Sequence, residues 1–108
     1  MMNKLMMTAA SAALLLMSGL ASADESAGQA LAQKNACLSC HGVDKKIVGP
    51  AYEDVAKKYK GDKGAKAKLI AKVKAGGKGV WGEIPMPPNP QVSAADLDKI
   101  VTWILSLK

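Results

Sequence analysis

The sequence predicts a small all-α domain, and three observations lead to this fold class. Apolar residues recur at helical spacing, most clearly near the C-terminus, where Leu97, Ile100 and Val101 follow an i, i+3, i+4 pattern that Ile104 continues. No stretch alternates apolar and polar residues as a half-buried strand would. Glycine and proline clusters divide the chain into short segments of helical length.

Residues 1–23 are predicted to be a cleaved signal peptide. Lys4 charges the N-terminus, an apolar run extends from about Leu5 to Leu20, and Ala21-Ser22-Ala23 forms a small-residue cleavage site. The run is short for a membrane span and Ser18-Gly19 interrupts it, so an uncleaved anchor is the weaker interpretation. We therefore expect export to the periplasm, no stable membrane insertion, and one mature domain at residues 24–108.

Four helices are expected in that domain. The first runs from Asp24 to Asn35 and opens with residues suited to an N-cap and a first turn. The second runs from Tyr52 to Tyr59, and the third from Ala65 to Ala75, where two glycines end it. The fourth opens at Ser93, with Asp96 at capping-box spacing.

The connections between these helices are expected to be loops. Gly42 to Pro50 forms one, and Gly79 to Gln91 another, in which four prolines exclude both regular helix and central strand. Gly28 is costly in a helix interior. It indicates either a close crossing with another helix or fraying near the start of the domain.

The segment Cys37-Leu38-Ser39-Cys40-His41 carries the chemistry of the chain. Two thiols three residues apart, followed directly by an imidazole, form the attachment motif of a c-type haem. The two sulfurs can add to the two vinyl groups on one edge of a porphyrin, while His41 reaches the iron. We expect one covalently attached haem c, bound through Cys37 and Cys40, with His41 as one axial ligand.

Two other interpretations of the cysteine pair are weaker. A thioredoxin-like redox couple requires a βαβ context, and no strand pattern surrounds the motif. A structural zinc site requires four ligands, whereas the sequence has two cysteines and one histidine. A covalent haem also supplies the apolar surface that so small a domain needs in order to fold.

Met86 is predicted to be the second axial ligand. It is the only methionine after residue 23, and it lies in the segment Ile84-Pro85-Met86-Pro87-Pro88-Asn89. Although a methionine more often fills a gap in a core, the prolines beside this one restrict its loop and lower the entropy lost on ordering. A thioether favours Fe(II) and raises the reduction potential. With both axial positions filled, the iron suits electron transfer rather than catalysis, so no catalytic residues and no enzymatic activity are expected.

With these motifs, residues 24–108 resemble the class I c-type cytochromes, and within them the small bacterial cytochrome c551/c8 group. The resemblance rests on the haem motif and on four further features: the segments Val48-Gly49-Pro50-Ala51-Tyr52, Gly79-Val80-Trp81-Gly82 and Ile84 to Asn89, and Trp103. It implies a small monohaem cytochrome c fold of about four helices wrapped around one covalently bound haem.

The resemblance also implies roles for residues around the iron. The carbonyl of Pro50 would accept a hydrogen bond from the His41 imidazole, as a metal-bound histidine usually requires. The indole of Trp81 would donate to a haem propionate, with ordinary packing as the alternative, and Asn89 would lie near the axial sulfur. Lys72 stands near the place where the family often has an arginine that reaches a propionate, and this sequence contains no arginine.

The chain is basic, with 15 basic and 9 acidic residues and a formal net charge of +6. Such a surface can favour nucleic acid, membranes or acidic proteins, and export argues against nucleic acid. We expect a monomer that carries electrons between a donor complex and a terminal oxidase or nitrite reductase, through acidic docking surfaces on these partners. The lysine-rich stretch from Lys57 to Lys78 is either the docking face or a solubilising surface.

Two other functions remain open from the sequence. A haem enzyme or gas-ligand sensor would need an open iron position, and therefore Met86 away from the iron. A subunit of a respiratory complex would bind its partners permanently.

Overall fold

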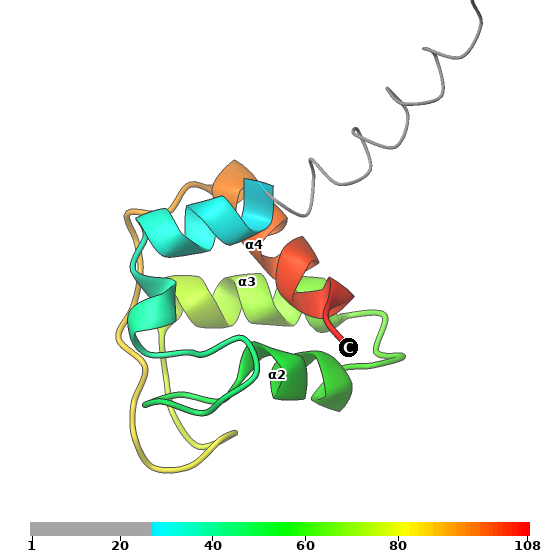
Figure 1. The fold of residues 1–108 in the computed structure, drawn as a ribbon. Coiled ribbons are helices and arrows are strands. Elements are labelled where there is room, and N and C mark those ends of the chain that lie inside the picture. Colours follow the sequence, from blue (N-terminus) through cyan, green and yellow to red (C-terminus); the bar gives the residue numbers. More distant parts are fainter. Residues whose placement is uncertain (1–26) are drawn as a thin grey trace, which may run out of the picture.

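The structure, a computed structural model, describes residues 27–108 (Figure 1). The expected signal peptide and the first residues of the expected first helix lie outside this range. Residues 27–34 are helical. They are followed by the 3₁₀ turn η1 and three α-helices, whose bounds are Cys37–Ser39 for η1, Tyr52–Lys58 for α2, Ala65–Ala75 for α3 and Ala94–Ser106 for α4. No strand occurs between residues 27 and 108, so the expected all-α fold class is confirmed.

The helices of the structure follow the expected ones closely. Helix α3 has the expected bounds, and α2 ends one residue earlier than expected. Ser93 is the N-cap of α4, and its Oγ accepts a hydrogen bond from the Asp96 amide at 3.1 Å. The turn η1 was not expected. It follows Ala36, whose φ of 60° lies in the left-handed region and turns the chain away from the first helix.

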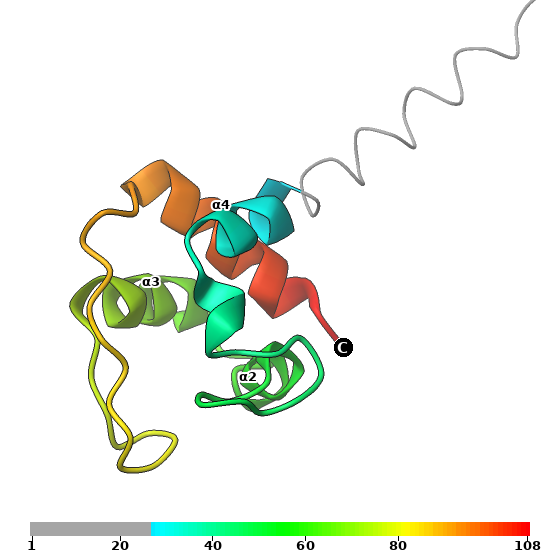
Figure 2. The ribbon, with the colours of Figure 1, turned by 60° about the vertical axis from the view of Figure 1, so that its left-hand side comes forward.

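Helix α4 forms the centre of the core. Its apolar side is buried along its whole length, and α2 and α3 both pack against it. The buried residues of α4 are Leu97, Ile100, Val101, Trp103 and Ile104. The helix of residues 27–34 crosses α4 (Figures 1 and 2). No helix in the described part of the chain is long and apolar enough to span a bilayer.

Gly28 permits this crossing. A Cβ atom at residue 28 would collide with the Cβ of Trp103 and would lie 2.5 Å from the carbonyl oxygen of Lys99. The two helix backbones therefore approach more closely than any residue with a side chain would allow. Of the two explanations that the sequence left open for Gly28, the structure supports the close crossing.

Candidate functional site

A pocket opens between the segment that follows the first helix and the loop that follows α3. Helices α2, α3 and α4 supply its floor through apolar side chains, which include Val55, Leu69, Val73, Ile100 and Ile104. About 1010 Å³ inside it is free of protein atoms, part of which is open solvent.

The four residues predicted to attach and ligate the haem all line this pocket. Cys37, Cys40 and His41 come from η1 and its end, where the amides of Cys40 and His41 both donate to the Cys37 carbonyl, at 3.3 and 3.1 Å. Cys40 is exposed and Cys37 is half-buried. Burial raises the pKa of the Cys37 thiol, an effect that the nearby Tyr52 hydroxyl partly opposes. Met86 reaches the same pocket from the loop after α3.

The His41 ring is held on two sides. Its Nδ1 lies 2.8 Å from the carbonyl oxygen of Pro50. Because a carbonyl can only accept a hydrogen bond, Nδ1 carries a proton, and Nε2 is the nitrogen that remains for a metal. The ring also stacks on Tyr52, with centroids 4.8 Å apart and planes inclined by 15°. These two contacts fix the orientation of the ring.

Backbone pairing holds Met86 in addition to its flanking prolines. The Gly77 amide donates to the Met86 carbonyl at 3.0 Å, and the Met86 amide donates to the Gly77 carbonyl at 2.8 Å. Gly76, which ends α3 with a φ of 75°, packs so closely that a Cβ there would lie 2.5 Å from the Met86 oxygen. The pairing is an isolated bridge between two segments rich in glycine and proline, so no periodic pattern in the sequence indicates it.

Asn89 ties the Met86 loop to α3. Its side-chain nitrogen donates to the carbonyls of Val73 and Pro87, at 3.3 and 3.1 Å, and its backbone amide donates to Val73 at 3.1 Å. Asn89 is not among the residues that line the pocket. Its expected place near the axial sulfur therefore stays a prediction, whereas its role in anchoring the loop is visible.

Trp81 and Lys72 both line the pocket. Trp81 is 43% exposed, and the Nζ of Lys58 lies 5.6 Å from its ring centroid. Lys72 extends from α3 toward the loop, so that a Cβ at Gly77 would lie 2.9 Å from the Lys72 Nζ. Both residues are thus near the pocket where the resemblance requires groups that meet haem propionates.

The donor set and the lining fit a covalently bound haem. Two thiols, an imidazole and a thioether meet at one largely apolar pocket, which suits a flat apolar ring with a central iron. Among residues 27–108, no three His, Cys, Asp or Glu side chains converge as they would for a metal ion alone. The zinc interpretation therefore lacks ligands, and the thioredoxin-like interpretation lacks strands in the same range.

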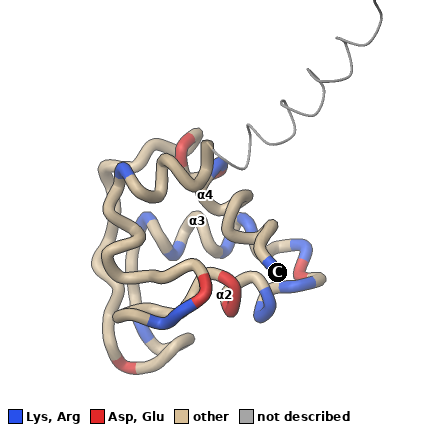
Figure 3. The backbone as a smooth tube through the Cα atoms, in the orientation of Figure 1, with Lys and Arg blue, Asp and Glu red and all other residues tan. Residues whose placement is uncertain are grey.

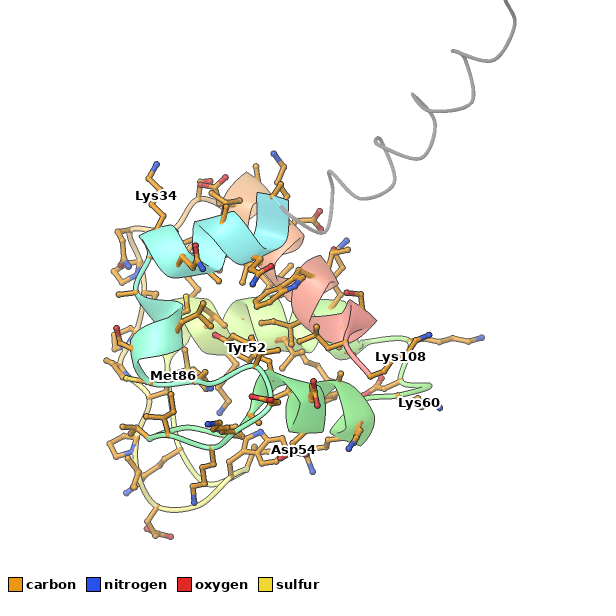
Figure 4. The ribbon with its side chains drawn as sticks, in the orientation of Figure 1. Lys34, Tyr52, Asp54, Lys60, Met86 and Lys108 are labelled. Atoms are coloured by element: carbon orange, nitrogen blue, oxygen red, sulfur yellow. The ribbon has the colours of Figure 1, made fainter. Side chains whose placement is uncertain are left out.

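Two residues of the segment from Val48 to Tyr52 make contacts at this site to which the sequence alone assigned no role. Tyr52 links the site to the core: it stacks on His41 and meets Trp103 edge to face, with centroids 5.6 Å apart. Figure 4 shows the side chain of Tyr52, the first residue of α2, in the interior of the molecule, where it is buried. Gly49 lies under the imidazole, where a Cβ would be 2.5 Å from Cε1 and 2.9 Å from Nδ1 of His41. A buried aromatic residue and a glycine next to a proline have no pattern that distinguishes these roles.

Known proteins resemble this chain in sequence and in fold. The family model described as Cytochrome c matches residues 25–108. The chain is 61% identical over 77 residues to cytochrome c-551 of Allochromatium vinosum. The aligned residues cover 71% of this chain and 82% of the relative. It is 50% identical over 97 residues to cytochrome c-552 of Nitrosomonas europaea, covering 90% of each chain. The crystal structure of wild-type Nitrosomonas europaea cytochrome c552 superposes with a TM-score of 0.72 and 51% identity, covering 74% of this chain and 99% of that one.

Because Gly49 packs closely against the His41 ring, we expect a larger residue at position 49 to be destabilising. Gly49→Ala should destabilise the haem-loaded protein by about 1–3 kcal/mol, because the added methyl must displace either the imidazole or the loop. Urea unfolding followed by haem absorbance would measure the change.

Gly64→Ala is the matched control. At Gly64 a Cβ would meet only the Asp62 Oδ1 at 3.5 Å and the Lys68 Cε at 3.6 Å, which are ordinary contacts. That variant should stay within about 0.5 kcal/mol of the parent. Equal stability of the two variants would mean that the ring is not confined by Gly49.

Proposed function

Because the chain belongs to the cytochrome c family, within its small bacterial c-551 group, we propose that it is a periplasmic one-electron carrier whose iron is held by His41 and Met86. Its cofactor is one covalently bound haem c, which supplies an iron that cycles between Fe(II) and Fe(III). The observation that carries the proposal is the meeting of Cys37, Cys40, His41 and Met86 at one pocket.

In this proposal the cysteines attach the haem, and His41 and Met86 bind its iron. Cys37 and Cys40 form thioethers that fix one edge of the ring, and η1 sets their spacing. His41 binds through Nε2, since Nδ1 donates to the Pro50 carbonyl, and that hydrogen bond makes the imidazole a stronger donor to the metal. Met86 completes the coordination with a soft sulfur, which raises the reduction potential.

The backbone pairing between Gly77 and Met86 favours an electron carrier over a haem enzyme or a gas-ligand sensor. Those alternatives need an open iron position, and therefore a methionine that can withdraw. The two hydrogen bonds of the Gly77–Met86 bridge hold the Met86 backbone beside the pocket, and both would have to break for this segment to move away. A site with two fixed ligands exchanges electrons with little rearrangement and has no position for a substrate at the iron.

We propose that residues 1–23 are removed on export and that residues 24–108 form the mature carrier. The match of the family model from residue 25 onward supports this division. A small carrier that exchanges electrons with larger redox proteins in the periplasm needs no permanent partner, so we favour a monomer over a stable subunit of a respiratory complex.

The lysines of the stretch from Lys57 to Lys78 have different neighbours. Lys72 and Lys78 line the haem pocket. Lys66 pairs with Asp98 of α4, and Lys68 pairs with Asp62. Figure 3 shows basic residues spread along α3 and around the end of α2 rather than gathered at one loop. In Figure 4, Lys60 and Lys108 lie at the end of the molecule away from Met86.

We propose that partners dock at the mouth of the haem pocket. Exposed apolar side chains gather there, namely Val48, Val80, Trp81 and Ile84, which line the pocket and are 43–65% exposed. A small apolar contact permits fast release, while Lys72 and Lys78 would attract an acidic surface on a donor complex, a terminal oxidase or a nitrite reductase. The remaining lysines of the stretch then act mainly on solubility.

Covalent attachment and export are tested together by intact mass. The protein purified from a periplasmic extract should weigh as much as residues 24–108 plus one haem, because both thiols add to the ring and the signal peptide is removed. A mass without haem would contradict the thioethers, and a mass that includes residues 1–23 would contradict cleavage.

Met86→Ala tests the axial ligand. The reduction potential should fall, by an amount inside the roughly 0.8 V that axial ligands span across haem proteins. Imidazole and carbon monoxide should then bind the iron, since the sulfur no longer blocks it. Voltammetry and ligand titration measure the two effects. If potential and spectrum match those of the parent, another residue holds the sixth position.

Charge reversal tests the docking surface. Lys78→Glu should slow the reaction with an acidic redox partner several-fold at low salt, and the difference should shrink toward about 0.15 M salt, where charges are screened beyond roughly 8 Å. Lys60→Glu makes the same charge change in a separate groove beside the C-terminus, and should slow it less. Stopped-flow rates that are equal for both variants would mean that docking depends on net charge alone.

A further inference from the structure

We propose that Lys58 is a positioning residue that holds Trp81, and with it the turn of residues 79–82, at the mouth of the haem pocket. The Nζ of Lys58 lies 5.6 Å from the centroid of the Trp81 ring, within the range at which an ammonium is attracted to an aromatic face. This role rests on the proposed function, because Trp81 matters there as a neighbour of the haem and of its docking partners.

The turn of residues 79–82 has little backbone support of its own. The Gly79 amide donates to the Gly82 carbonyl at 2.8 Å, which closes the turn on itself. Both glycines have positive φ, 106° and 122°, and a Cβ at either would have no neighbour within 4 Å. The backbone therefore projects into open space, and glycines at both ends leave it many alternative conformations. A side-chain contact with the helical body is needed to select one of them.

Lys58 is well placed to make that contact. It is the last residue of α2, and α2 is fixed in the core by the buried Tyr52, Val55 and Ala56. A cation at the C-terminus of a helix is also favoured by the helix dipole. Trp81 lies far along the chain from Lys58. The contact therefore joins the turn to α2, with which the backbone of the turn forms no hydrogen bond.

Fixing Trp81 has consequences at the haem. The turn precedes Met86 in the same loop, and Val80 and Trp81 line the pocket together with Met86. A turn that opens more often would expose the haem edge to water and would release Trp81 from a propionate, without removing any ligand from the iron. Lys58 thus acts on the environment of the haem through the aromatic ring.

Amide hydrogen exchange of the haem-loaded protein tests this role. In Lys58→Gln the amides of residues 79–83 should exchange two- to fivefold faster, the factor expected when an exposed cation–π contact is lost. Lys57→Gln is the matched control: it removes the same charge from the adjacent residue, which borders the separate groove near the C-terminus. It should leave these amides unchanged. Lys58→Arg should keep the parent rates, because a guanidinium also stacks on an aromatic face.

A loss of charge near the haem could alter the protein without any contact to Trp81, so the same change is repeated in a Trp81→Leu background. There Lys58→Gln should have no further effect on exchange. Equal acceleration with and without Trp81, or equal behaviour of the Lys57 and Lys58 variants, would overturn the proposal. Axial ligation is read separately from the optical spectrum of each variant, so a failure of the His/Met assignment is distinguishable from a failure of the Lys58 contact.

Discussion

The hydrogen bond between His41 Nδ1 and the Pro50 carbonyl, 2.8 Å long, is the interaction on which the rest of the site depends. It orients the ring and ties the cysteine motif to the segment that enters α2. From there the connection continues through packing: His41 stacks on Tyr52, and Tyr52 meets Trp103 edge to face. Since Trp103 belongs to the buried side of α4, the orientation of one imidazole is coupled to the centre of the core.

The two ligand segments are held by different means. The histidine side relies on side-chain contacts and on the Val48 and Gly49 amides, which both donate to the Cys40 carbonyl, at 3.0 and 2.7 Å. The methionine side relies on its prolines, on the backbone bridge to Gly77, and on the Asn89 amide bound to the end of α3. Helix α3 therefore positions the methionine loop, whereas α2 and α4 position the histidine.

Much of the fold could be predicted because its signals are local. Ser93 and the apolar spacing that follows it fix the start and the buried side of α4, and the glycines after Ala75 fix the end of α3. What could not be predicted depends on contacts between distant segments. Gly28 allowed two explanations until Trp103 and Lys99 were seen against it. The Gly77–Met86 bridge has no periodic pattern, and a run of lysines does not reveal which of them border the pocket.

The crossing at Gly28 joins the first helix of the domain to the last. Contacts between the first and last helices of a domain close its largest loop, so they require the complete polypeptide. A chain that emerges N-terminus first cannot bury Trp103 against Gly28 until its last helix has appeared. The cysteine pair, which follows the first helix directly, is therefore accessible to covalent modification during the whole interval in which the core is incomplete.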